Sequence, residues 1–247
     1  MWADVLATDG LWLLFFAAGL AGLVRGFSGF GTGMIYVPLA AQVLSPVWVL
    51  ISIMVIDVLG PIPIIPRTLR ESAPKDVMRL MIGALVGVPL GVMVLLILPV
   101  DLFRYAVSVL TLALLVLLIM GYRFKGTVGA PMTVGIGMSG GFMAGSVGLP
   151  GPPVIFFYMS RALSPAVIRA NIMLYLFLVD ALLLCVLFLR GILETEPLLI
   201  GFILMPIYGL AIMVGALIFD PERETQYRYV AYAVIAFSAL SGLAFWH

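Results

Sequence analysis

The sequence is poor in charged residues and in the side chains that usually bind metals. Charged residues make up 10% of its 247 positions, against roughly 25% in soluble domains. It holds one cysteine, Cys185, so no disulfide framework exists within a chain, and one histidine, His247. The usual ligand sets for zinc or haem are therefore missing, and we expect no metal site and no cofactor. The net charge of +1 comes without a basic patch, so nucleic acid is not an expected partner.

Apolar residues dominate instead. They make up 64% of the sequence, and the mean hydropathy is +1.23. A chain of this composition would expose far too much apolar surface in water. The sequence therefore predicts an integral membrane protein, surrounded by the lipid bilayer. The first apolar run follows Asp4 and Asp9 rather than lysine or arginine, so a cleaved signal peptide is not expected.

Six apolar runs are long enough to cross a bilayer core, which needs roughly 20 helical residues. They are residues 47–65, 77–98, 103–120, 168–189, 198–219 and 229–246. Two further stretches, 11–41 and 131–160, are apolar but interrupted by glycine and proline. Each predicts either a hairpin of short helices or a helix followed by a re-entrant segment. Non-helical backbone at that depth is tolerated only where protein buries it or a cavity hydrates it.

The two interrupted stretches share a motif, at residues 22–46 and 141–165. A fixed offset of 119 places Gly22, Gly26, Gly29, Leu44, Ser45 and Pro46 on Gly141, Gly145, Gly148, Leu163, Ser164 and Pro165. Paired Gly/Pro interruptions at matching positions of two halves are a sequence pointer to the binding site of a transporter. A third series, Gly83, Gly87 and Gly91, instead has the spacing of glycines at which membrane helices pack closely.

The basic residues indicate the topology. If the N-terminus is outside and each interrupted stretch turns back to the side it came from, the outer segments hold only Arg104 and Arg190. The cytoplasmic loops then hold ten basic residues: Arg67, Arg70, Lys75, Arg79, Arg123, Lys125, Arg161, Arg169, Arg223 and Arg228. This is the positive-inside bias. We therefore predict an all-α, polytopic transmembrane bundle of two inverted-topology repeats, residues 1–125 and 126–247. Each repeat is a glycine-rich broken hairpin plus three spanning helices, with both termini outside.

A short helix that begins inside each interruption would point its free N–H groups and its dipole into the break, which suits an anion. The expected binding residues are Gly29, Gly31, Thr32 and Gly33 in the first break, and Gly148, Leu149, Pro150 and Gly151 in the second. Arg25 is either a cation at the entry of an anion path or a side chain that reaches for the membrane surface. Arg169 and Asn171 could offer a cation and an amide to an oxyanion, and the alternative for Arg169, which we favour, is an anchor at the cytoplasmic end.

Two carboxyl groups, Asp57 and Asp180, fall inside predicted spans. An ionised carboxylate there costs several kcal/mol, so each must be protonated, paired or facing a wet cavity. Each is a candidate proton carrier, and the alternative is a hydrogen-bonded structural carboxyl. No histidine lies within the apolar runs, and no serine or cysteine has a base beside it. An enzyme is therefore not expected.

These residues resemble the sulfite exporter TauE/SafE family, also called the toluene sulfonate uptake permease family. Residues 22–38 keep its glycine-rich segment followed by proline, whereas residues 141–153 carry Pro150, Pro152 and Pro153 where glycines are commoner. Members often show Thr-Ser where this chain has Ala170, Asn171 and Ile172.

The resemblance implies a secondary transporter of sulfite, or of organosulfonates such as isethionate or sulfoacetate, across the bacterial inner membrane. An ion gradient would drive it, with one repeat rocking against the other. The alternatives are a passive channel for small solutes and a carrier of another small organic anion, such as a carboxylate. A homodimer is compatible with so small a carrier.

Overall fold

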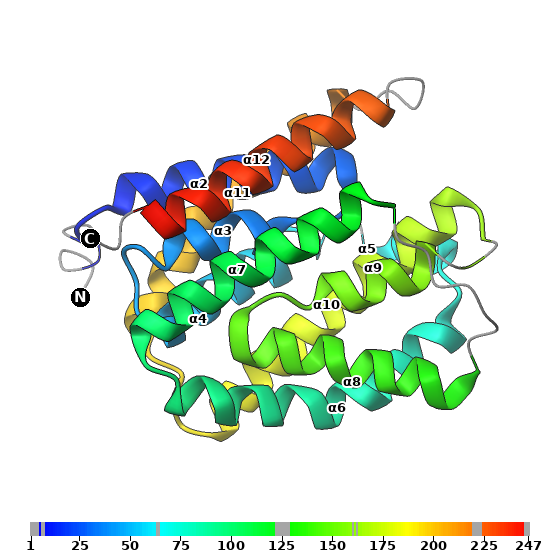
Figure 1. Ribbon diagram of the computed structural model, residues 1–247, viewed down its shortest axis with the longest axis horizontal. Coiled ribbons are helices and arrows are strands. Elements are labelled where there is room, and N and C mark those ends of the chain that lie inside the picture. The colour runs from blue at the N-terminus through cyan, green and yellow to red at the C-terminus, as the bar shows by residue number, and fades with distance from the viewer. Residues whose placement is uncertain are drawn as a thin grey trace.

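The structure is a computed structural model that describes residues 5, 8–62, 65–121, 129–159, 161, 163–218 and 224–244. The regular structure of these residues is entirely α-helical, which confirms the predicted fold class. The helices are α2 (Leu11–Ser28), α3 (Thr32–Ala40), α4 (Pro46–Leu59), α5 (Ile65–Glu71), α6 (Pro74–Ile97), α7 (Val100–Ile119), α8 (Ala130–Val147), α9 (Gly151–Met159), α10 (Pro165–Leu189), α11 (Thr195–Ile218) and α12 (Glu224–Ala244). They form one elongated bundle (Figure 1).

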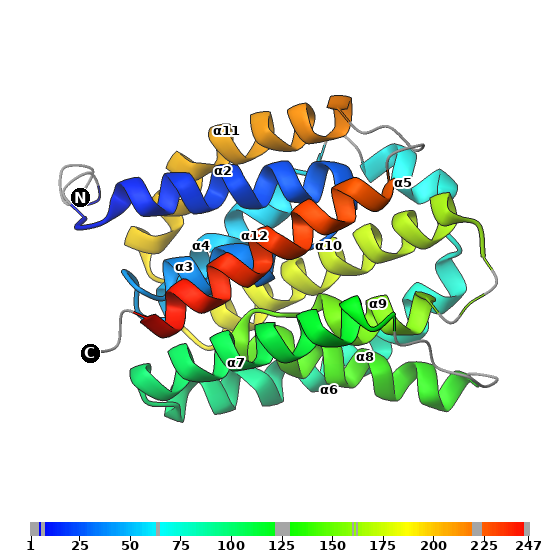
Figure 2. The same ribbon diagram turned by 45° about the horizontal axis from the view of Figure 1, so that its top comes forward.

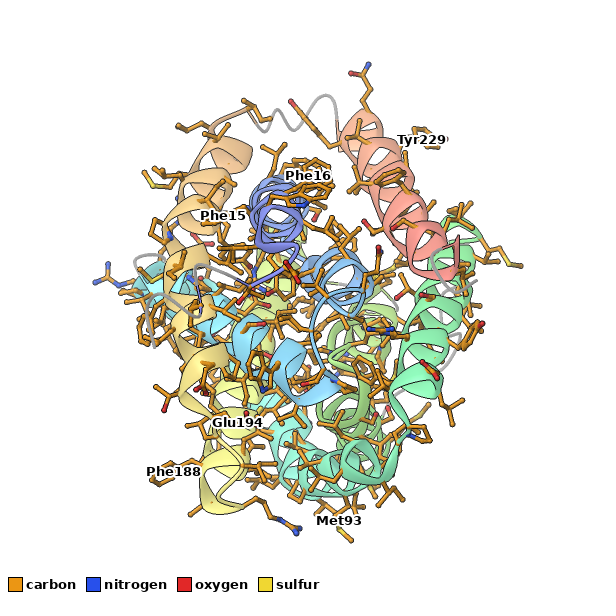
Figure 3. All side chains as sticks on the ribbon, turned by 90° about the vertical axis from the view of Figure 1, so that its left-hand side faces the viewer. Phe15, Phe16, Met93, Phe188, Glu194 and Tyr229 are labelled. Atoms are coloured by element: carbon orange, nitrogen blue, oxygen red, sulfur yellow. The ribbon has the colours of Figure 1, made fainter. Side chains whose placement is uncertain are left out.

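Five of these helices are long and apolar enough to cross a membrane, namely α2, α6, α7, α10 and α11. The surface of the bundle is apolar as well. Seen from one end, Phe16, Met93, Phe188 and Tyr229 project outward from different sides of the bundle (Figure 3), and all four are exposed. Apolar side chains can remain exposed on the surface of a protein when that surface contacts the lipid of a bilayer. The chain is therefore a membrane protein.

One predicted span is wrong at its C-terminal end. Residues 47–65 were expected to form a single crossing, but α4 ends at Leu59 after 14 residues. Pro61 follows, and proline has no N–H for the helical ladder and restricts the residue before it. The separate helix α5 lies at the end of the bundle opposite the start of α2 (Figure 2), and it carries Arg67 and Arg70. The predicted span 229–246 corresponds to α12, and its last two residues lie outside the described residues.

Both predicted helix breaks are present. Each consists of an 18-residue helix followed by a nine-residue one: α2 then α3, and α8 then α9. Gly31 has φ 101° in the first break and Gly148 has φ 70° in the second. This left-handed region is open to glycine and strained for other residues. Of the two arrangements that the sequence allowed, the structure has the longer helix followed by a short segment.

Helices from the two halves of the chain pack in pairs with their backbones almost touching. One pair is α2 with α11 and the other is α6 with α8, on opposite sides of the bundle (Figure 1). A methyl group added to Gly26 would lie 2.4 Å from the carbonyl oxygen of Ile212, and one added to Gly83 would lie 1.9 Å from that of Val134. We call these two contacts the glycine seams.

The glycine seams confirm the packing role predicted for Gly83, Gly87 and Gly91, all of which face α8. They also separate two roles within the repeated motif. Gly26 and Gly145, which share the same register, belong to the seams, whereas Gly29 and Gly148 have the positive φ of the breaks. In the same way, α4 packs against α11 and α6 packs against α10, so each of these contacts joins a helix of one half to a helix of the other. Two inverted repeats would produce this pattern, and the repeat itself stays a prediction.

Candidate functional site

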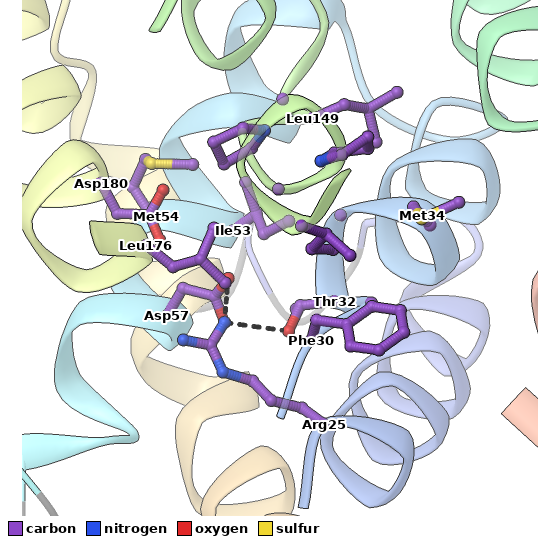
Figure 4. A pocket seen from close by; sticks show the side chains of 17 residues that line it. Arg25, Phe30, Thr32, Met34, Ile53, Met54, Asp57, Leu149, Leu176 and Asp180 are labelled. Atoms are coloured by element: carbon purple, nitrogen blue, oxygen red, sulfur yellow. Dashed lines mark hydrogen bonds and ion pairs between the residues drawn. The ribbon is translucent and has the colours of Figure 1, made fainter. Parts of the chain in front are cut away.

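A closed ring of polar side chains lies in the bundle interior, built from four helices. Arg25, in the last turn of α2, is 2% exposed. Its Nη1 lies 2.8 Å from Oδ2 of Asp57 in α4 and donates to Oγ1 of Thr32, the first residue of α3, at 3.1 Å (Figure 4). The hydroxyl of Tyr208 in α11 donates to Oδ1 of Asp57 and lies 2.9 Å from the Thr32 hydroxyl. The ring therefore ties the first helix break to α4 and α11.

The ring explains how Arg25 and Asp57 are tolerated at this depth. A buried cation and a buried carboxylate each need a partner, and here each has the other. The partnership is incomplete on one side, because Nε and Nη2 of Arg25 are buried without a hydrogen-bond partner. A guanidinium carries five N–H donors, so part of this cation is left to bind something else.

A small cavity lies against the ring. Its volume is about 30 Å³, which is space for about two water molecules. Both helix breaks line it, together with α4 and α10 (Figure 4). Its apolar wall includes Phe30, Ile53, Met54, Ile155 and Leu176. The cavity therefore has charged residues on one side and an apolar wall on the other.

The N-terminus of α3 supplies backbone donors to this cavity. The first helical hydrogen bond is donated by Ile35 to the carbonyl of Gly31, at 3.1 Å. The amides of Thr32, Gly33 and Met34 precede it, and such amides lack an acceptor within their helix. In the second break, Pro152 and the residue after it have no N–H at all. The two breaks are therefore unequal, and the first one provides most of the donors.

Asp180 in α10 is the second carboxyl of the cavity. It is 1% exposed, and neither of its carboxyl oxygens has a hydrogen-bond partner. It points into the cavity near Met54 and Leu176 (Figure 4). It also lies close enough to Asp57 and Arg25 for the three charges to interact. Asp57 is thus paired within the ring, whereas Asp180 stands without a bonded partner.

The structure brings most of the predicted site residues together. The cavity is lined by Arg25, Gly31, Thr32, Gly33, Asp57, Gly148, Leu149, Pro150, Gly151 and Asp180. Among the residues that the structure describes, no group of three or more His, Cys, Asp or Glu side chains could hold a metal ion.

Two predicted residues lie away from the cavity lining. Gly29 faces Arg169, whose Cγ would lie 3.1 Å from an added methyl group. Arg169 itself donates from Nη2 to the carbonyl of Gly26 at 2.9 Å, which fastens the start of α10 to α2. Asn171 is fully buried, and its Oδ1 accepts a 2.7 Å hydrogen bond from the amide of Ala73, just before α6. The side chains of Arg169 and Asn171 therefore make contacts between helices.

Sequence reasoning missed Tyr208, which closes the polar ring. Tyrosines near the ends of spans are common interfacial anchors, and tyrosine is easily taken for one of these. Tyr208 sits near the middle of the apolar run 198–219. A hydroxyl at that depth needs a hydrogen-bond partner, and this requirement is the sequence signal that points to Tyr208.

A polytopic helix bundle in which two interrupted helices enclose buried donors and a cation is the architecture of membrane transporters. Residues 14–242 match the family model described as Sulfite exporter TauE/SafE, and the chain belongs to this family. The family consists of membrane transporters of sulfite and related anions and is not a family of enzymes. No curated protein and no solved structure matches the chain.

Proposed function

We propose that this protein is a secondary transporter that carries a small sulfur oxyanion, sulfite or an organosulfonate such as isethionate or sulfoacetate, across the bacterial inner membrane. The anion binds between the two helix breaks, and its transport is coupled to an ion gradient. Family membership supports anion transport. The family also supports a sulfur oxyanion as the substrate, and the residues that line the cavity support the place where it binds.

The observation that carries the proposal is the convergence of unused donors on one buried cavity. Nε and Nη2 of Arg25 have no partner, and the amides of Thr32, Gly33 and Met34 lie at the start of α3. A helix N-terminus with a buried guanidinium is a favourable place for an oxyanion, because both present N–H groups to oxygen. The apolar wall next to them suits the carbon skeleton of an organosulfonate.

The cavity in this structure is too small for such a substrate, since about 30 Å³ holds about two water molecules. We infer that α3 and α9 move apart when the site loads, in an alternating-access cycle. We place the end of the bundle that carries α5 in the cytoplasm, since Arg67 and Arg70 lie there. The start of α2 and the end of α12 then lie on the outer side, as predicted for the two termini.

A thermal-shift screen of the detergent-purified protein tests the proposal. The probes are sulfite, sulfate, isethionate, sulfoacetate and taurine, each compared with the carboxylate that matches it. A ligand at about 100 times its Kd stabilises the fold by about 2.7 kcal/mol. We expect stabilisation by a sulfonate to exceed that by its carboxylate analogue, and we expect uptake of the same anion into proteoliposomes to saturate.

Variants locate the site. Arg25→Met removes the guanidinium that we assign to the anion, and Arg190→Met is the matched control because Arg190 is exposed at the end of α10. The control should respond to the anion as the wild type does. A wild-type protein that responds to no anion, or a flux that never saturates, would reject the carrier in favour of a passive channel. An equal response to the carboxylate would make the substrate a small organic anion instead.

A further inference from the structure

The two intramembrane carboxyl groups have different surroundings, and the difference separates their roles. Asp57 has a guanidinium at 2.8 Å and the Tyr208 hydroxyl on its other oxygen. Asp180 has no hydrogen bond to either oxygen, and it is 1% exposed. An ionised carboxylate is stable in the interior when it is paired, as Asp57 is. An unpaired carboxylate is far less stable there, and protonation removes the charge that is costly to bury.

The charged and titratable neighbours of Asp180 are few. Arg25 on α2 and Asp57 on α4 act on it electrostatically, and Tyr175 lies on the same helix, α10. Tyr208 on α11 is linked to Asp180 only indirectly, through its hydrogen bond to Asp57. The residues of α3 and α9 that line the cavity carry no titratable group. Since Arg25 is already paired with Asp57, nothing in this set neutralises Asp180.

The charge of the site then limits what can bind. With both carboxyl groups ionised, Arg25, Asp57 and Asp180 together carry one negative charge, which repels an incoming anion. A proton on Asp180 brings this sum to zero. A bound monoanion then restores a single negative charge, so the empty site and the loaded site carry the same charge through the membrane.

We propose that Asp180 is the proton site of the carrier, that it takes up one proton with each monoanion, and that Asp57 remains ionised throughout. The proton passes from water that enters the cavity to a carboxylate oxygen of Asp180. It returns to water when the anion leaves on the other side. The proposal rests on the proposed function, and it names the coupling ion and the residue that carries it. One monoanion moves with one proton, so transport is electroneutral.

The first test measures the affinity for isethionate from about pH 5 to about pH 9, a range in which a sulfonate stays ionised. Because the anion binds the protonated form, wild-type affinity should fall by about tenfold for each pH unit above the apparent pKa of the site. Asp180→Asn should make the affinity independent of pH. Asp180→Glu should restore the slope, and the exposed-surface control Asp101→Asn should keep it.

The second test observes the proton directly. Infrared difference spectra of the wild type, with and without isethionate, should show a protonated carboxyl band on binding. The band should vanish in Asp180→Asn and persist in the exposed-surface control Asp101→Asn. A band kept in Asp180→Asn would overturn the assignment, and so would an unchanged pH slope in Asp180→Asn. Wild-type affinity that is independent of pH would reject proton coupling while leaving anion binding intact, whereas no binding at any pH would reject the proposed function itself.

Discussion

Gly33 and Gly148, which are 115 positions apart in the sequence, touch in the middle of the bundle: a methyl group on Gly33 would lie 2.4 Å from the Gly148 carbonyl oxygen. The first turn of α3 is thus pressed against the turn that ends α8. The side chain of Leu149 lies beside this contact, with its Cδ2 3.3 Å from the position of the same methyl group. The two breaks, one from each half of the chain, therefore meet directly and line the same cavity.

The pairing of Arg25 with Asp57 should be visible in stability as well as in binding. Arg25→Met leaves a buried carboxylate without its cation, and we expect it to lower the free energy of unfolding by about 3–5 kcal/mol. The double variant Arg25→Met/Asp57→Asn should recover most of that loss while binding no anion. Denaturation in detergent measures the first effect and the anion thermal shift the second. A single variant as stable as the wild type would mean that the ion pair adds nothing.

The hydroxyl of Thr32 connects Arg25 to Tyr208. Thr32→Val keeps the shape but removes this connection, which is worth about 0.5–1.5 kcal/mol. Anion affinity should fall by about two- to tenfold, because Arg25 is then held less firmly. Thr111→Val is the matched control, since the Thr111 hydroxyl on α7 is buried without a hydrogen-bond partner. That control should bind the anion with unchanged affinity.

Asn171 should matter for stability and not for the substrate. Its Oδ1 accepts the amide hydrogen of Ala73 at 2.7 Å, and the residue is fully buried. Asn171→Ala leaves that amide without its hydrogen-bond acceptor, which should destabilise the fold by about 1–3 kcal/mol. The folded fraction should bind the anion as the wild type does. A lost anion response in a variant of normal stability would return Asn171 to the binding site.

The glycine seam between α6 and α8 can be tested with two glycines of one helix. A methyl group on Gly137 would lie 2.0 Å from the carbonyl oxygen of Leu80, whereas one on Gly135 would meet nothing within 4 Å. Gly137→Ala should therefore push the helices apart and cost about 1–3 kcal/mol. Gly135→Ala should be neutral or slightly stabilising. Equal melting temperatures for the two variants would contradict the close packing.

The sequence is enough to predict the helical membrane bundle and the position of both breaks. Apolar run length reports spans directly, and a glycine at positive φ, such as Gly31 or Gly148, leaves a local mark in the sequence. The boundary error at residues 47–65 had a local signal too, because Pro61 interrupts the run. These features depend on neighbouring residues alone, which is why a single sequence reveals them.

The polar ring could not be predicted in the same way. Arg25 and Asp57 are 32 positions apart, and Tyr208 is 151 positions beyond Asp57. Their contact depends on how α2, α4 and α11 cross, which periodicity does not contain. The rule that a buried cation needs a buried anion would have suggested pairing Arg25 with Asp57 or Asp180. It could not have chosen between them, and that choice decides which carboxyl stays unpaired.

The two glycine seams decide which parts of the molecule can travel as rigid bodies. Each seam joins a helix from residues 1–125 to one from residues 126–247. A rocking motion that separated the two halves of the chain would have to separate α2 from α11 and α6 from α8, and so break both glycine seams. A motion that carries α2 with α11, against α6 with α8, opens neither. We therefore expect the rigid bodies of a transport cycle to combine helices from both sequence halves, rather than to coincide with the two predicted repeats.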